Sequence, residues 1–297
     1  MSLSPDARPG KAETGSRRRS AELILFSITF IWGGTFAVVK FALGDASPLT
    51  FVAIRFGIAS LLFPLIYRKN YLKMDKGTLA SGLLLGFLLM IGFAFQTVGL
   101  KYTTASKSAF ITGLLVAFTP IAQAVIEKKM PTKGNLIGVG LVAIGLFLLT
   151  SPGGQGFNIG DLLTLGCAIS YAIYIVYLDI YSKKHDVAKL TLLQLSETAV
   201  LSIVAAPFFE TMHVYFTAGF IWALAYTAIL ATVFATYLQT KYQRETTPVR
   251  AAIIFSMEPV LANVIAFLAF GEFVGVIGAI GGVLIVAGLL TSELLDW

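Results

Sequence analysis

Charged residues are scarce in this chain, since Asp, Glu, Lys and Arg together make up only 13% of its 297 residues. Soluble domains carry about 25% charged residues, and disordered chains combine low hydrophobicity with a high net charge. The 57% share of hydrophobic residues and the mean hydropathy of +0.82 therefore exclude both classes. They predict a membrane protein with several spanning segments.

Cysteine and histidine are nearly absent, with one Cys and two His in the whole chain. The single cysteine, Cys167, cannot form an internal disulfide, and its apolar surroundings predict a small buried residue. No spacing of Cys, His, Asp or Glu resembles a metal site, and no glycine-rich loop follows a strand to hold phosphate. We therefore expect no metal, no cofactor, no ATP-driven step and no enzymatic activity. Because His185 and His213 lie in loops, we also expect no buried histidine relay.

Ten apolar runs are long enough to cross a bilayer, which takes about 20 residues of helix. We expect these spans at residues 21–41, 48–67, 79–99, 106–126, 134–150, 160–180, 189–207, 218–240, 248–270 and 275–291. Short loops use almost all of the remainder, and residues 1–20 are polar enough to predict a disordered cytoplasmic tail. The sequence thus predicts an all-α membrane protein without a separate soluble domain.

The lysines and arginines follow the positive-inside rule. With the N-terminus in the cytoplasm, the tail holds five and the four cytoplasmic loops hold four, three, three and three, so that 18 of the 22 lie on that side. Lys40, Lys101 and Lys107 are expected at the opposite interface. Ten spans then place both termini in the cytoplasm, and the absence of an organelle signal predicts the inner cell membrane. The net charge of +6 needs no nucleic-acid partner.

The two halves of the chain resemble each other. Phe-Gln-Thr at residues 95–97 recurs as Leu-Gln-Thr at residues 238–240, and each copy is followed by a Thr-Thr pair and later by a proline. Trp32 corresponds to Tyr171, and Arg55 corresponds to Gln194. Five spans per half make the second copy enter the membrane inverted, which is typical of secondary transporters. We expect the first repeat over residues 21–150 and the second over residues 151–297.

Several motifs resemble the EamA-domain branch of the drug/metabolite transporter superfamily. They are Trp-Gly-Gly-Thr-Phe at residues 32–36, Phe-Val-Ala-Ile-Arg-Phe at 51–56, Ala-Phe-Ile-Thr-Gly-Leu at 109–114 with Pro120, Met-Glu-Pro-Val at 257–260, and Gly-Glu at 271–272. The resemblance covers residues 21–291. It implies ten helices in two inverted five-helix repeats around a central cavity lined mostly by helices one to four and six to nine. One departure is Glu-Lys-Lys at residues 127–129, where the family usually has Gly-Glu.

Polar and aromatic side chains inside the spans are the candidate substrate contacts, because such groups need a partner or a wet cavity in a membrane. Arg55 can form a bidentate fork with a carboxylate. Alternatively, it can extend to the lipid headgroups or pair structurally with a helix terminus. Tyrosines on the sixth span form one stripe, suited either to stacking on substrate or to the membrane interface. The two glutamines can bind substrate or tie helices together. The predicted contacts are Trp32, Arg55, Gln96, Tyr171, Tyr174, Gln239 and Glu258.

Two carboxylates and three backbone positions complete the prediction. Glu197 and Glu258 lie inside spans and are candidates for proton coupling. Gly113, Pro120 and Pro259 are predicted hinges, because proline interrupts the hydrogen bonding of a helix. Small residues four apart, at residues 134–138 and 278–282, predict close helix packing.

The sequence therefore predicts a secondary transporter in the lipid bilayer that exports small organic metabolites by alternating access. Amino acids or similar amphipathic molecules are the expected substrates, and protons are the candidate coupling ion. The alternatives are efflux of hydrophobic or quaternary cations and import of a metabolite by the same fold. The close-packing glycines are compatible with a monomer or with a weak homodimer.

Overall fold

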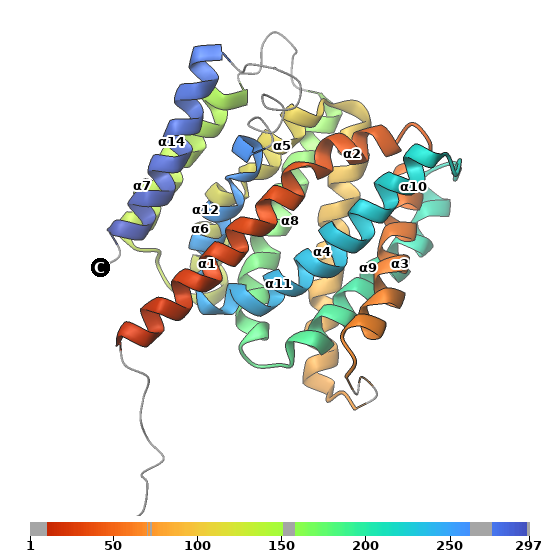
Figure 1. The fold of residues 1–297 in the computed structure, drawn as a ribbon, viewed down its shortest axis with the longest axis horizontal. Coiled ribbons are helices and arrows are strands. Elements are labelled where there is room, and N and C mark those ends of the chain that lie inside the picture. Colours follow the sequence, from red (N-terminus) through yellow and green to blue (C-terminus); the bar gives the residue numbers. More distant parts are fainter. Residues whose placement is uncertain (1–10, 70, 72, 151–157, 262–274, 296–297) are drawn as a thin grey trace, which may run out of the picture.

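A computed structural model describes residues 11–69, 71, 73–150, 158–261 and 275–295. These residues form helices joined by short loops, with one isolated bridge between Ala46 and Val214 as their only β-type pairing. Within these described ranges, eight helices are long and apolar enough to cross a membrane, and Lys133–Leu148 is a shorter apolar helix. The all-α membrane fold predicted from the sequence is confirmed (Figure 1).

The helices follow the expected spans, and four spans consist of more than one helical segment. In the first half they are α1 (Lys11–Gly33), α2 (Thr35–Ala42), α3 (Pro48–Ile66), α4 (Lys76–Tyr102), α5 (Ala105–Gly113), α6 (Leu115–Glu127) and α7 (Lys133–Thr150). In the second half they are α8 (Ile159–Ser182), α9 (Val187–Phe209), α10 (Ala218–Ala225), the π-helix η1 (Tyr226–Phe234), α11 (Ala235–Tyr242), the short 3₁₀ helix η2 (Gln243–Glu245), α12 (Pro248–Phe255) and α14 (Gly275–Leu294).

Two boundaries differ from the prediction or lie beyond the described residues. Residues 11–20, expected to be disordered, belong to α1, because no proline interrupts the basic stretch before the apolar run. Residues 1–10 lie outside the described residues. Of the ninth span, expected at residues 248–270, the structure describes only the part up to Leu261.

Local capping explains where the helices begin. The carboxylate of Asp75 accepts the backbone N–H of Thr78 at 2.9 Å and thereby caps α4. Hydrogen bonds from the Thr78 side chain and backbone lower the pKa of Asp75 to about 2. Asn158 and Asp161 form a reciprocal capping box at the start of α8, and Pro48 occupies the first turn of α3.

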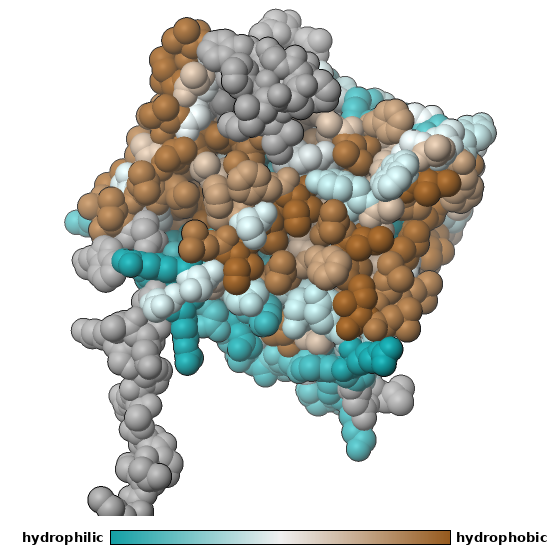
Figure 2. Space-filling model, viewed as in Figure 1, coloured by the Kyte–Doolittle hydropathy of each residue, from teal (hydrophilic) through white to brown (hydrophobic). Residues whose placement is uncertain are grey.

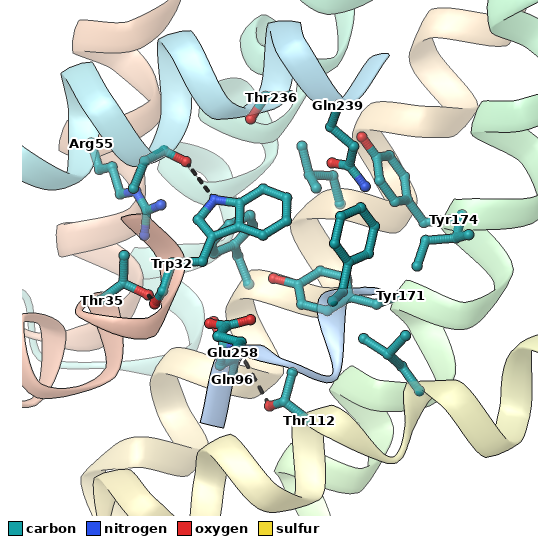
Figure 3. Close-up of a pocket in the computed structure, with 16 residues that line it drawn as sticks. Trp32, Thr35, Arg55, Gln96, Thr112, Tyr171, Tyr174, Thr236, Gln239 and Glu258 are labelled. Carbon is teal, nitrogen blue, oxygen red and sulfur yellow. Dashed lines mark hydrogen bonds between the residues drawn. The ribbon is translucent and has the colours of Figure 1, made fainter. Parts of the chain in front are cut away.

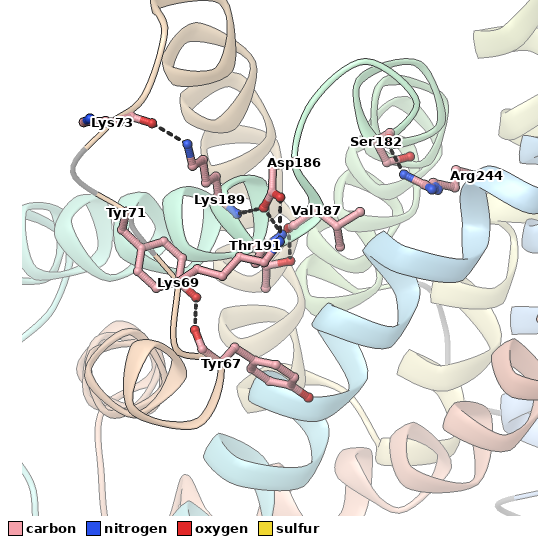
Figure 4. A network of polar contacts seen from close by, with 11 residues as sticks. Tyr67, Lys69, Tyr71, Lys73, Ser182, Asp186, Val187, Lys189, Thr191 and Arg244 are labelled. Carbon is pink, nitrogen blue, oxygen red and sulfur yellow. Dashed lines mark hydrogen bonds and ion pairs between the residues drawn. The ribbon is translucent and has the colours of Figure 1, made fainter.

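At the end of the bundle where lysines and arginines gather, polar contacts join the loop between α3 and α4 to the start of α9 (Figure 4). Lys69, which follows α3, pairs with Asp186 at 2.7 Å, and Lys189 donates to the backbone carbonyl of Lys73. Burial alone would raise the pKa of Asp186, but the bonds from Lys69 and from the backbone N–H of Lys189 lower it. The contacts hold the α3–α4 loop against the start of α9.

The contacts between α7 and α14 reveal the inverted repeat (Figure 1). Gly138 lies against the backbone of Gly288, and Gly145 lies against that of Gly281. Gly281 and Gly288 lie 143 residues after Gly138 and Gly145, so they are the equivalent positions of the second repeat. The duplication therefore relates the first contact to the second. Such reciprocal contacts are the signature of a twofold axis. Gly138, one of the small residues predicted to pack closely, thus shares this pair of contacts with Gly145, seven residues later on α7.

Replacing Gly138 with leucine is expected to destabilise the protein. A Cβ at this position would lie 2.7 Å from the Gly288 carbonyl oxygen, and backbone cannot move aside as a side chain can. Overpacking typically costs about 1–3 kcal/mol, so the Tm in detergent should fall by roughly 5 °C. Gly140→Leu is the matched control on the same helix, because nothing lies within 4 Å of its Cβ position. Equal Tm losses in both variants would contradict this packing.

Two broken helices cross at the centre of the bundle. The break between α5 and α6 falls at Leu114, and the break after α12 falls at Ser256 and Met257, of which Met257 lies 143 residues after Leu114. The Ser256 hydroxyl donates to the Gly113 carbonyl oxygen at 3.4 Å, so the equivalent positions touch. The chain does not break at Pro120, which lies inside α6. Pro259 follows the second break and begins the next turn, where a missing N–H is tolerated.

The surface has the character expected of a protein surrounded by lipid. Large apolar side chains are exposed on the outer helices, including Phe147 at 55% on α7 and Val283 at 68% on α14. Figure 2 shows an extensive hydrophobic face, with hydrophilic residues gathered along its lower edge. The basic loops and the start of α1 lie at this hydrophilic edge, which agrees with the alternation predicted from the sequence.

Candidate functional site

A cavity lies at the centre of the bundle, beside the two helix breaks (Figure 3). The space open to the centres of water molecules is about 80 Å³, which is room for several waters at about 10–15 Å³ each by this measure. Sixteen residues line it: Trp32, Thr35, Arg55, Leu89, Phe93, Gln96, Thr112, Leu115, Tyr171, Tyr174, Ile175, Ala231, Thr236, Gln239, Phe255 and Glu258.

All seven predicted substrate contacts lie around this cavity, although they come from six different spans. Their role in binding stays a prediction, but their convergence on one place is an observation. The cavity is lined by spans one to four, six, eight and nine. Span seven, which is α9, contributes no lining residue.

Arg55 is the cation of the cavity and is only 3% exposed. Its Nε donates to the hydroxyl of Thr232 at 2.7 Å, and its Cζ lies 4.7 Å from the centre of the Phe93 ring. The guanidinium thus gains both a hydrogen bond and a cation–π contact. In Figure 3 the guanidinium points toward Trp32 and the cavity. This position excludes the alternative in which Arg55 extends to the lipid headgroups.

The π-helix η1 holds both Arg55 and Trp32. The Thr232 hydroxyl that accepts from Arg55 donates in turn to the Thr227 carbonyl at 2.8 Å. The indole Nε1 of Trp32 donates to the Ala231 carbonyl at 3.0 Å. π-Helices are rare and are often found at functional sites. The equivalent segment of the first repeat lies in the regular helix α4, so the repeats differ at the cavity wall.

Aromatic residues pair edge to face along the wall of the cavity. The ring of Trp32 lies 5.3 Å from that of Phe255, and the ring of Tyr171 lies 5.7 Å from that of Phe93, both edge to face. Tyr171 also packs against Gly92 so closely that a Cβ there would clash with its ring. Tyr174 donates its hydroxyl to Gln194 at 2.7 Å and presents its ring to the cavity.

The two symmetry-related glutamines make bonds within the protein. Gln96 donates to the Thr112 hydroxyl at 3.4 Å, and Gln239 donates to the side chain of Gln243 at 3.2 Å. Gln243 in turn donates to the Ile175 carbonyl at 2.7 Å. Both amides therefore connect helices and also line the cavity.

Glu258 is the carboxylate of the cavity. It lies directly after the second helix break, and its side chain points toward the space near Trp32 and Gln96 (Figure 3). Neither a hydrogen bond nor an ion pair joins it to another described residue. In particular, Arg55 and Glu258 line one cavity without forming an ion pair with each other.

Glu197, the other candidate for coupling, lies elsewhere. It is half-buried on α9, where its side chain faces Gly86 of α4. It does not line the cavity.

Further residues of the site were not among the predicted contacts; four of them contact predicted residues directly, namely Thr232, Phe93, Phe255 and Thr112. Threonines at positions 227, 232, 236 and 240 are spaced by five, four and four residues, and the step of five falls within the π-helix.

Comparison with known proteins decides the family. The profile of the EamA-like transporter family matches the chain twice, over residues 19–151 and residues 158–293. The chain belongs to the EamA-like transporter family. The resemblance stated from the motifs is thereby confirmed, and each half of the chain carries one match.

Known relatives of this EamA-like chain are transporters by name. An "uncharacterized transporter" of Archaeoglobus fulgidus is 35% identical over 96% of this chain and 89% of its own. The "uncharacterized transporter YyaM" of Bacillus subtilis is 28% identical over 91% of this chain and 92% of its own. One crystal structure superimposes with a TM-score of 0.78 over 93% of this chain and 97% of its own, at 20% identity, which supports the fold alone.

Proposed function

We propose that this membrane transporter exports small zwitterionic metabolites, and amino acids in the first place, by alternating access. The observation that carries the proposal is the pair of opposite charges in one cavity. Arg55 and Glu258 both line it and do not neutralise each other. A zwitterion presents a carboxylate and an ammonium group that match this pair.

The two ends of the substrate have different partners. Arg55 is held through Nε, which leaves the two Nη groups as a fork for the substrate carboxylate. Glu258 accepts the ammonium group, and the faces and edges of Trp32 and Tyr171 surround the side chain. The cavity is small, so the closed form suits a small or medium substrate.

Orientation and coupling complete the proposal. We propose that both termini lie in the cytoplasm and that the protein resides in the inner cell membrane, which the basic loops support through the positive-inside rule. Protons are the candidate coupling ion. Glu258 lies at the substrate, whereas Glu197 acts only if coupling passes through the contact between α9 and α4.

Efflux of hydrophobic or quaternary cations is the second candidate, and the aromatic wall with Glu258 favours it. Cations bind to aromatic faces and carboxylates. Arg55 in the same cavity opposes it, since a bare cation would meet the guanidinium without a carboxylate to offset the repulsion. Import of a metabolite by the same fold is the remaining alternative.

Flux from proteoliposomes tests the proposal. Vesicles are loaded with labelled neutral, aromatic, acidic and basic amino acids, a nucleoside, a sugar and a quaternary cation, with and without a pH gradient. Selective efflux of zwitterionic amino acids over protein-free vesicles is the expected result. Efflux of the cation alone would replace the proposal by drug export.

A further inference from the structure

Two polar clusters lie at opposite ends of the bundle, away from the cavity. The first, the Glu22 cluster, joins α1 to the start of α12. The Glu22 carboxylate accepts from the Thr246 hydroxyl at 2.6 Å and lies 3.3 Å from Nη1 of Arg250. Arg250 also donates to the Ser292 carbonyl at 2.9 Å, which adds α14 to the cluster.

The second, the Asp161 cluster, joins α8 to the start of α5. The Asp161 carboxylate accepts from the Thr103 hydroxyl at 2.7 Å and pairs with Lys107 at 2.5 Å. The cluster thus has the same three parts as the first: a carboxylate, a threonine and a cation.

The two clusters occupy equivalent positions in the two repeats. Glu22 and Asp161 are 139 residues apart, as are Trp32 and Tyr171. Thr246 and Arg250 follow Thr103 and Lys107 by 143 residues, as Gln239 follows Gln96. The second threonine of each Thr-Thr pair caps the next helix in both copies, at Thr104 and Thr247. The repeated Thr-Thr pair of the sequence is therefore a repeated structural device.

Each cluster connects the two halves of the chain on one side of the cavity. Glu22 precedes the cavity residue Trp32 by ten residues, and Asp161 precedes Tyr171 by ten residues. Ten residues of helix span about 15 Å. Because the second repeat is inverted, the two clusters lie on opposite sides of the cavity, with the Glu22 cluster at the end where the basic loops gather. The small volume of the cavity agrees with both being formed at once.

The clusters are buried, unlike ordinary surface ion pairs. The side chains of Asp161 and Arg250 are 0% and 4% exposed, and those of Lys107 and Glu22 are 14% and 13% exposed. Exposed pairs contribute little to stability, whereas breaking a buried pair leaves a charge without its partner. A buried pair that joins two halves of a transporter is therefore suited to hold one end shut.

We infer that these clusters are the two gates of the transporter: the Glu22 cluster locks the cytoplasmic entrance and the Asp161 cluster locks the extracellular one. The inference rests on the proposed function, since gates require alternating access. Opening one end separates one carboxylate from its cation while the other cluster stays formed.

Labelling of a cysteine in the cavity tests the gates in the full-length protein. Cys167→Ala removes the native thiol, and Thr35→Cys places a single thiol in the cavity wall. A membrane-impermeant maleimide is applied to right-side-out cells and to inside-out vesicles. Asp161→Asn should raise the labelling rate from outside about tenfold and lower it from the cytoplasmic side. Glu22→Gln should do the reverse.

Three further variants keep the test decisive. If the charge variants fold poorly, Thr103→Val and Thr246→Val replace them. Each removes one hydrogen bond and should change the labelling rates in the same direction as the charge variant of its cluster, by about threefold. Lys69→Gln is the control, since it breaks the exposed ion pair with Asp186 at the cytoplasmic end and should change neither rate. Changes that are equal on both sides, or absent in all four gate variants, overturn the assignment.

Labelling and flux together distinguish failure of the gate assignment from failure of the proposed substrate. Side-specific labelling in a protein that moves no amino acid would support the gates and refute the proposed substrate. Amino-acid flux together with labelling that does not depend on side would refute the gates and leave the proposed function standing.

Discussion

Arg55→Met is expected to abolish amino-acid flux in proteoliposomes while flux of a quaternary cation does not fall. Methionine keeps most of the apolar stem of arginine but cannot bind a carboxylate. Truncating one partner of a buried, hydrogen-bonded charge pair typically costs about 2–5 kcal/mol, which corresponds to a loss of about 30-fold or more. Arg55 meets this condition because its side chain is buried and its Nε is fixed by Thr232.

Two controls show whether the charge itself is responsible. Arg55→Lys keeps a positive charge without the fork and should retain a small part of the flux. Arg244→Gln removes an arginine from the loop region, where its ion-pair partner is the exposed Glu245, and should change nothing. If amino-acid flux survives in Arg55→Met, the arginine is structural and the zwitterion proposal is wrong. If both fluxes vanish and the Tm falls, the substitution has disturbed folding. A cysteine-labelling assay of the cavity must then be made on the same variant.

The sequence predicted the spans and the cavity residues for the same physical reason. A charged or amide side chain in hydrocarbon is so unfavourable that it must face protein or water. Arg55, Gln96, Gln239 and Glu258 could therefore be selected without knowing how the helices pack. Trp32 was supported by its correspondence with Tyr171, and the structure brings the pair to the same cavity.

Contacts between distant segments could not be predicted in this way. Glu197 satisfied the same rule as Glu258, but the packing of α9 on α4 leaves it outside the cavity. The prolines indicated where the helices lose a hydrogen bond, yet the breaks fall at Leu114, beside the predicted hinge Gly113, and at Ser256. The two helices cross where Ser256 meets Gly113. The Thr-Thr pairs were visible as a repeat, but their carboxylate partners lie far away in the chain.

Glu258→Gln is expected to lower the flux of zwitterionic amino acids at least tenfold and also to lower the flux of any quaternary cation. The amide keeps the shape of the side chain and removes the charge that an ammonium group would meet. The loss should appear mainly in KM, since the substrate ammonium loses a contact while the opening of the ends is unchanged. This pattern differs from that of Arg55→Met, which affects only substrates with a carboxylate.

Glu197→Gln is the matched control, because it removes the same charge from a half-buried site on α9 that does not line the cavity. Its KM for amino acids should equal that of the parent protein. Measuring flux at several pH values in both variants then assigns the coupling. Loss of pH dependence in Glu258→Gln alone would place proton coupling at the substrate, where one carboxylate binds the ammonium group or a proton in turn. Loss in Glu197→Gln alone would move coupling to the α9–α4 contact, and an unchanged KM in Glu258→Gln would refute the ammonium site.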